Sequence, residues 1–160
     1  EISLEKEFFS SKISPYLSNM IAAYMFKSRP DLNILSFDEF KKKLIINFRQ
    51  AWIVRQFENE YNPVHYHSGH LSGVGYLKLP NDFGKLFQSS KPKNLNGNIA
   101  LIHGGKMFNS ESVFEIEPKV GDFYLFPNYL MHTVYPFYGK DERRSISFNA
   151  TIDENIYNIN

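Results

Sequence analysis

Three histidines are the residues of this sequence whose types and spacing could do chemistry. His65 and His67 stand one residue apart, and His132 follows much later in the chain. Side chains two residues apart in an extended segment point to the same side, so His65 and His67 can bind one ion together. Three imidazoles suit iron, zinc, copper or nickel and leave coordination positions open. The pattern predicts a metal centre made of His65, His67 and His132.

The two remaining histidines have to be weighed against this set. His70 could replace His67 as a ligand, because the intervening Ser68-Gly69 is flexible. The alternative is that His70 is exposed or lies beside the ligands at the mouth of the site. His103 precedes Gly104-Gly105 and is expected to be a loop residue.

A strand near the end of the sequence carries residues that could hold an anion. Alternation from residue 143 to 149 places four polar side chains on one face: Arg143, Ser145, Ser147 and Asn149. An arginine followed two residues later by a serine can hold a carboxylate through a charged fork and a hydroxyl. Arg143 is favoured over Arg144 because Ser145 and the polar face follow it. The alternative is a surface strand whose arginines form weak ion pairs.

Composition limits the class of protein. The 160 residues are 42% hydrophobic and 16% aromatic, which fits one folded domain that leans toward β structure. A net charge of +1 argues against nucleic acid as a partner. The sequence has no cysteine, which excludes disulfides and thiolate metal sites and is compatible with a cytoplasmic location. No run approaches the ~18 apolar residues of a membrane span, so no membrane partner is expected.

The first fifty residues are predicted to be helical. Apolar residues recur at helical spacing from Leu17 to Phe26. Ser36 and Glu39 form the pattern of a capping box, which predicts a second helix from Phe37 to about Arg49.

From Trp52 onward the pattern changes to short β-rich runs separated by Gly, Pro and Asn. This spacing is typical of a β sandwich or barrel, with a loop over one end at residues 80–98. The predicted strands are 52–58, 73–79, 99–103, 113–117, 122–127, 132–137 and 143–151.

These features resemble the 2-oxoglutarate/Fe(II)-dependent dioxygenases, and among them the small, prolyl-hydroxylase-like oxygenases of marine bacteria and phages. The resemblance runs from about Trp52 to Thr151 and rests on the stretches 65–77, 121–132 and 143–149. It implies a mainly β fold with N-terminal helices: a double-stranded β-helix, or jelly roll, as in cupins. One domain would fill residues 1–160, with helical support over about 1–50 and the jelly-roll core over about 52–151.

The resemblance also implies roles for individual residues. His65 and His132 would be the first and last ligands of Fe(II), and Arg143 with Ser145 would bind the distal carboxylate of 2-oxoglutarate. Tyr76 would touch that same carboxylate. Two further residues would lie near the site or line it: Trp52 and Asn149.

One departure from the family pattern concerns the second metal ligand. The superfamily uses Asp or Glu at this position, whereas this chain has His67. Three neutral ligands leave the iron more positively charged than a carboxylate would.

The implied activity is hydroxylation, in which oxidative decarboxylation of 2-oxoglutarate to succinate and CO2 is coupled to oxidation of a substrate C–H bond. The partners would be 2-oxoglutarate, O2 and a primary substrate, either a peptide or a small molecule. A homodimer is expected at family level, in the cytoplasm of a bacterium or, for a phage protein, of its host.

Two other functions compete with this one. A cupin enzyme that uses no 2-oxoglutarate would suit the histidines and the Gly121-Asp122 turn, but cupins carry a Glu where Leu71 and Ser72 stand. A jelly-roll binding module could use an aromatic platform made of Tyr129, Tyr135, Phe137 and Tyr138. His132→Ala would inactivate an enzyme and leave ligand binding by such a module intact.

Overall fold

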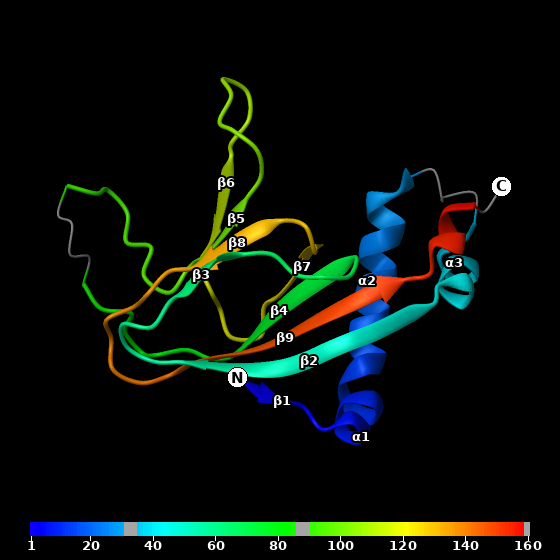
Figure 1. Ribbon diagram of the computed structural model, residues 1–160, viewed down its shortest axis with the longest axis horizontal. Coiled ribbons are helices and arrows are strands. Elements are labelled where there is room, and N and C mark those ends of the chain that lie inside the picture. Colours follow the sequence, from blue (N-terminus) through cyan, green and yellow to red (C-terminus); the bar gives the residue numbers. More distant parts are fainter. Residues whose placement is uncertain (31–34, 86–89, 159–160) are drawn as a thin grey trace.

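Two antiparallel β-sheets face each other and form the body of the protein (Figure 1). The computed structural model describes residues 1–30, 35–85 and 90–158. The strands are β1 Ile2–Ser3, β2 Ile46–Gln56, β3 Asn62–His65, β4 Leu71–Lys78, β5 Ile99–Ile102, β6 Val113–Ile116, β7 Phe123–Pro127, β8 Met131–Val134 and β9 Arg143–Ile152. The helical elements are α1 Lys6–Phe8, the π-helical turn η1 Phe9–Ile13, α2 Ser14–Ser28, α3 Phe37–Lys43 and the 3-10 helix η3 Glu154–Asn158.

The strand order identifies the fold. The larger sheet has the order β1-β2-β9-β4-β7 and the smaller has the order β3-β8-β5-β6. From β2 to β9 the chain passes back and forth between the sheets, and β5 and β6 form a hairpin that projects from the body (Figure 1). This winding of eight antiparallel strands is a double-stranded β-helix, which confirms the predicted jelly roll.

Two hydrophobic cores hold the sheets in place. The first lies between the sheets and includes Val74, Tyr76, Ile99 and Phe126. The second lies on the outer face of the larger sheet, where α2 runs across the strands (Figure 1). Leu17, Ile21 and Met25 recur every four residues on α2, so one helix face packs on Phe148 and its neighbours. The helix predicted over residues 17–26 is therefore confirmed, with its face buried as the periodicity indicates.

The second predicted helix is right at its start and wrong at its end. Ser36 and Glu39 form the expected capping box, but α3 ends at Lys43 and not near Arg49. Ile45 and Ile46 are β-branched, and Phe48 packs edge-on against Phe148 when β2 pairs with β9. Sheet pairing over eleven residues outweighs the helical pattern, so the helical support ends before residue 50 and β1 adds a strand to the sheet edge.

Strand β3 was not among the predicted runs. It contains Pro63 and pairs only with β8, as an edge strand can tolerate. The predicted loop at 80–98 has no helix or strand in residues 80–85 and 90–98, while 86–89 lie outside the described residues. No helix in the described part of the chain is long and apolar enough to cross a membrane.

Candidate metal centre

The three predicted histidine ligands come together between the two sheets. His65 ends β3 and His132 lies on β8, directly opposite His65 in the strand pairing. His67 follows two residues after β3 ends. One ligand atom from each imidazole lies within 4.8 Å of the others, which is close enough for one ion to bind all three after small side-chain rotations.

Backbone carbonyls orient two of these imidazoles. His65 Nδ1 lies 2.6 Å from the carbonyl oxygen of Pro63, and His132 Nδ1 lies 3.0 Å from that of Leu130. When each Nδ1–H donates to its carbonyl, Nε2 keeps a free lone pair for a metal. Asn62 makes a weak approach to His65 Nε2 at 3.5 Å, which an ion would replace.

Electrostatics keep the buried members of the triad neutral. Burial lowers the pKa of His132 to about 4. The hydrogen bond to the Leu130 carbonyl raises this pKa slightly, and the charges of His65 and His67 lower it further. Burial also lowers the pKa of His67, and His65 adds to this shift. Neutral imidazoles are the form that binds a metal, so the site is prepared for an ion at neutral pH.

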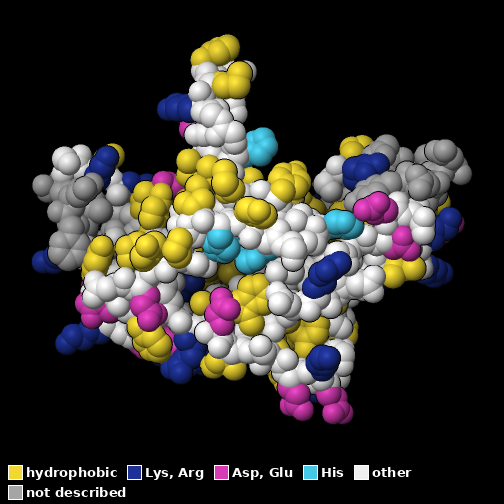
Figure 2. Space-filling model, in the orientation of Figure 1, with side chains coloured by type: hydrophobic (Ala, Val, Ile, Leu, Met, Phe, Trp, Pro, Cys, Tyr) yellow, Lys and Arg dark blue, Asp and Glu magenta, His cyan; other side chains and the backbone are white. Residues whose placement is uncertain are grey.

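A cavity of about 490 Å³ opens from the histidines into the space between the sheets. Figure 2 shows histidine side chains at the edge of a hollow on this face of the molecule. This volume is typical of a small-molecule site. β2 and β9 supply much of one wall, because their inward residues pair across the strands: Trp52 with Ser147, Val54 with Ser145 and Gln56 with Arg143.

Arg143 is the buried cation of this cavity, whose other lining arginine, Arg55, pairs with Glu142. Arg143 is only 2% exposed, and its Nε and Nη2 have no hydrogen-bond partner among the described residues. Nη1 donates to Gln56 Oε1 at 3.3 Å, and no carboxylate in the described ranges forms an ion pair with Arg143. Burial lowers the pKa of Arg143, yet an arginine stays charged in proteins. A buried cation with unused donors is suited to a carboxylate ligand.

Gln56 is a site residue that the sequence prediction missed. Its amide nitrogen donates to the backbone of Glu60 at 2.6 Å, while its oxygen accepts from Arg143. It therefore holds the guanidinium against the loop that leads to β3. Alternation from Trp52 through Val54 to Gln56 would have placed it on the cavity face.

Tyr76 lies next to Arg143, on the inner face of β4. The guanidinium carbon sits 5.0 Å from the centre of the Tyr76 ring, a cation–π contact. The hydroxyl is buried without a hydrogen-bond partner in the described structure, and Tyr76 does not contribute to the cavity wall. Burial raises the pKa of Tyr76, and the charge of Arg143 opposes that shift. Contact between Tyr76 and a ligand stays a prediction.

Arg144 points away from the cavity, as expected from the alternation along β9. It forms two short hydrogen bonds with Glu142, whose other partner is Arg55. The two arginines lower the pKa of Glu142 to about 2. Arg144 therefore has its own carboxylate, and Arg143 has none.

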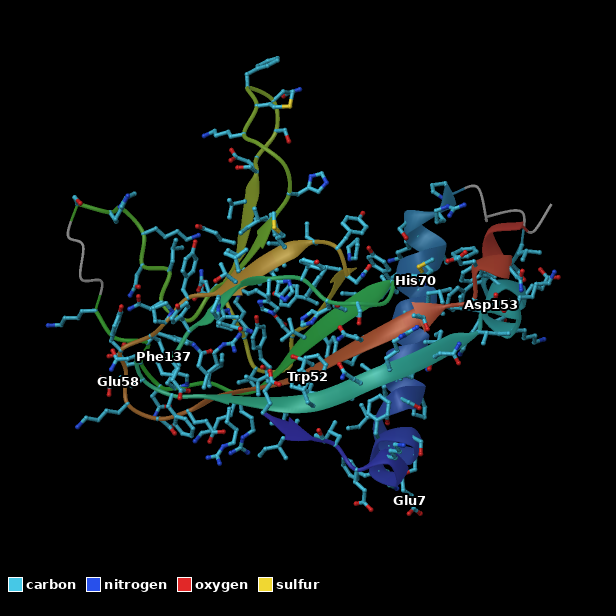
Figure 3. All side chains as sticks on the ribbon, viewed as in Figure 1. Glu7, Trp52, Glu58, His70, Phe137 and Asp153 are labelled. Carbon is cyan, nitrogen blue, oxygen red and sulfur yellow. The ribbon has the colours of Figure 1, made fainter. Side chains whose placement is uncertain are left out.

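The structure separates His70 and His103 from the triad. His70 Nδ1 accepts a hydrogen bond from the backbone N–H of Ile152 at 3.0 Å, and the residue lies toward α2, away from Trp52 (Figure 3). His103 follows β5 in the projecting hairpin. The alternative in which His70 replaces His67 is not supported by this geometry.

Trp52 and Asn149, both expected near the site, occupy different positions. Trp52 lines the cavity, its ring centre lies 5.8 Å from that of His67, and its buried Nε1 has no partner among the described residues. Asn149 does not line the cavity. It accepts a hydrogen bond from Ser72, which does.

Comparison with known proteins identifies the family of the chain. A family model described as "Putative 2OG-Fe(II) oxygenase" matches residues 50–149. The chain belongs to this family. Membership confirms the family that the sequence resembles. Among curated proteins, none matches the chain.

Three solved structures are similar at low identity. An oxidoreductase of the 2OG-Fe(II) oxygenase family from Burkholderia pseudomallei is 15% identical, with 68% of this chain and 46% of that chain covered and a TM-score of 0.48. A Pseudomonas putida prolyl-4-hydroxylase is 17% identical (66% and 52% covered, TM-score 0.45). A viral collagen prolyl hydroxylase from Paramecium Bursaria Chlorella virus-1 is 19% identical (79% and 69%, TM-score 0.47). The chain spans about half the length of the first two.

Proposed function

We propose that this protein is an Fe(II)- and 2-oxoglutarate-dependent hydroxylase. One observation supports this most strongly: a buried arginine with no carboxylate partner among the described residues lines the same cavity as three imidazoles. A metal enzyme that uses no 2-oxoglutarate gains nothing from such a residue, because a buried unpaired charge costs free energy. A 2-oxoglutarate oxygenase needs it to hold the far end of the cosubstrate.

Each part of the cavity has a role in this proposal. The iron would be held by His65, His67 and His132. The hydrogen bonds from Nδ1 to backbone carbonyls would fix the rings of His65 and His132. Arg143 would bind the distal carboxylate of 2-oxoglutarate, with Ser145 supplying a hydroxyl and Tyr76 a further donor. Two unused guanidinium nitrogens match the two oxygens of a carboxylate.

The bound iron would supply oxygen activation coupled to oxidative decarboxylation of 2-oxoglutarate. The chain's own residues orient the reactants and limit the access of water. Gln56 and the Tyr76 ring keep the guanidinium in place from two sides. Val74, Phe126 and Val134 form apolar walls of the cavity, which strengthen electrostatic contacts inside it.

Succinate release tests this activity. With Fe(II), O2 and 2-oxoglutarate, the protein should form succinate slowly even without a primary substrate, and His132→Ala should abolish this. Ser147→Ala is a matched control, because it changes the cavity wall without removing an iron ligand or the arginine. Equal succinate formation by the wild type and His132→Ala would contradict the proposal.

The proposal extends to the type of substrate, the location and the oligomeric state of the enzyme. The reaction would be hydroxylation of a peptide or a small molecule, in a cytoplasmic enzyme that forms a homodimer and consists of one domain. Sedimentation of the purified protein with and without Fe(II) measures the oligomeric state directly. A jelly-roll binding module with a degenerate metal site is the rival function. Of its expected aromatic platform, Tyr129 is 67% exposed, but Phe137 is fully buried and cannot contribute.

A further inference from the structure

A second cavity of about 570 Å³ adjoins the first. It lies where β1 and the start of α1 meet β2, and the two cavities share Trp52 and His67 in their walls. His67 is a proposed iron ligand, so the second cavity reaches the ring of one ligand of the metal. A substrate of an oxygenase must reach the metal in this way, while 2-oxoglutarate occupies the end of the first cavity at Arg143.

The second cavity has an apolar wall and a cationic rim. Phe9 and Phe48, on the helix side of β2, pack edge to face with ring centres 5.2 Å apart, and Trp52, on the other face of the strand, lines the end of the cavity next to His67. Lys6 and Arg49 also line this cavity, and neither forms an ion pair with a carboxylate in the described ranges. Glu1 is the acidic residue in the wall, so cations outnumber carboxylates there.

A β-bulge accounts for the position of Arg49. The pairing of β2 with β9 shifts register between Phe48 and Gln50, which leaves Arg49 as the extra residue. Bulges bend a strand and redirect side chains, and they are common beside active sites. Without the bulge, Phe48 would share a face with Trp52 and could not pack on Phe148 on the helix side. The bulge thus allows Phe48 to support the helices and Arg49 to stand at the cavity rim.

The geometry points to the second cavity as the binding site of the primary substrate, and to an organic anion with an aromatic or aliphatic body as its class. The apolar body would lie on Phe9, Phe48 and Trp52, and the anionic group would meet Lys6 and Arg49. This inference rests on the proposed hydroxylase function, because it uses the metal site to define the reacting end.

The single tryptophan of the sequence provides the readout, since Trp52 lines both cavities. Metal-free protein is titrated with 3-phenylpropionate, 3-phenylpropanol and 3-phenylpropylamine, which share one body and differ in charge, while Trp52 fluorescence is followed. The propionate should bind saturably and roughly fivefold to tenfold tighter than the alcohol, and the amine weakest. Added salt should reduce this preference, because both cations are exposed.

Two variants locate the binding. The double change Lys6→Gln and Arg49→Gln should remove the preference for the propionate, whereas Lys41→Gln with Lys42→Gln, on exposed positions of α3, should not. Arg143→Gln should also leave the preference intact. The inference is overturned if no probe binds, if the three bind equally, if the preference survives the double change, or if Arg143→Gln abolishes it. Tighter binding of an uncharged peptide would also overturn it.

Binding of 2-oxoglutarate distinguishes failure of the substrate inference from failure of the proposed hydroxylase function. The double change at Lys6 and Arg49 should leave binding of 2-oxoglutarate to the iron-loaded protein unchanged. A wild type that binds 2-oxoglutarate but shows no preference for the propionate would reject only the substrate class. Absence of 2-oxoglutarate binding in the wild type would reject the hydroxylase itself.

Discussion

Arg143 is the residue whose position costs the fold most and explains the site best. A charge that is 98% buried loses its hydration, and only Gln56 and the face of Tyr76 compensate it among the described residues. Its neighbour Arg144 shows the ordinary arrangement, with an exposed guanidinium paired to Glu142. This contrast supports the proposal that Arg143 is the arginine that binds a ligand and that Arg144 is structural.

Arg143→Gln should weaken 2-oxoglutarate binding by roughly a hundredfold, since it removes a two-pronged charged hydrogen bond. Arg144→Gln should change it by less than about twofold, because that side chain bonds Glu142. Calorimetric titration of the iron-loaded, oxygen-free protein measures both. Equal losses, or the reverse order, would show that the two arginines have been assigned to the wrong faces.

His67→Ala should lower the affinity for Fe(II) by at least about tenfold, because one of three neutral ligands is lost. His70→Ala should leave iron affinity unchanged and reduce only stability, since His70 accepts a hydrogen bond from the Ile152 N–H. Iron content after dialysis against a chelator gives the comparison. Unaltered iron in His67→Ala would remove this residue from the triad.

Glu142 makes stability depend on pH at the junction of β2 and β9. Its pKa falls to about 2 in the folded protein, below the usual 4.5, so it stabilises the fold above the usual pKa. That contribution is lost as the pH falls toward 2, and it is modest because Arg55 and Arg144 are 45% and 41% exposed.

Comparison with Glu142→Gln tests this effect. The difference in unfolding free energy between the wild type and the variant should shrink from about pH 6 to about pH 3. Urea unfolding at several pH values gives the difference. A gap that stays constant over this range would mean that Glu142 acts through its shape and hydrogen bonds alone.

At the scale of elements, β4 is the strand that lets the two cores approach each other. Gly73 faces the outer core, where a Cβ would lie 2.4 Å from Phe148 Cε1 and 3.0 Å from Leu125 Cδ2. Phe148 is fully buried and already packs against Phe48 and Phe123, so the ring has no room to move. Glycine is therefore required here by close approach, and not by backbone conformation.

Gly73→Ala should lower the unfolding free energy by about 1–3 kcal/mol, the cost of overpacking a well-filled core. Gly105→Ala, on the exposed hairpin where a Cβ meets no atom within 4 Å, should stay within about 0.5 kcal/mol of the wild type. Urea denaturation distinguishes them. A Gly73→Ala protein as stable as the wild type would show that Phe148 can shift.

Short sequence patterns predicted the features that depend on neighbouring residues in the chain, such as helix starts and the face on which a side chain lies. The capping box located the start of α3, and the period of two put Arg143 inside and Arg144 outside. The end of α3 could not be predicted in this way, because it depends on β2 pairing with β9, about a hundred residues away in the sequence. Strand β3 could not be predicted for the same reason. Its Pro63 argues against a strand in the sequence, and its pairing with β8 is visible only in the fold.

The site as a whole needed the resemblance and the topology together. His65 and His67 were recognisable from their spacing, but only the strand pairing puts His132 opposite His65. Gln56 was missed: alternation along β2 places it on the cavity face, but its role depends on the partner Arg143, which only the fold brings next to it. Sequence alone also gave no indication of the second cavity, which depends on the bulge at Arg49.

At the scale of the whole molecule, the two sheets form a cavity lined by three clustered histidines and by the buried cation Arg143. This arrangement allows one small molecule to span both, with one carboxylate at Arg143 and its other end at the histidines. The central claim is that 2-oxoglutarate is this molecule and that iron is the metal.

The most direct test is an oxygen-free absorbance titration of the metal-free protein, first with Fe(II) and then with 2-oxoglutarate. We predict a visible charge-transfer band that saturates with 2-oxoglutarate, is absent from His132→Ala, and needs far more cosubstrate in Arg143→Gln. Iron binding without such a band would contradict the claim and favour a metal enzyme that uses no 2-oxoglutarate. Absence of iron binding would leave only a jelly-roll binding module.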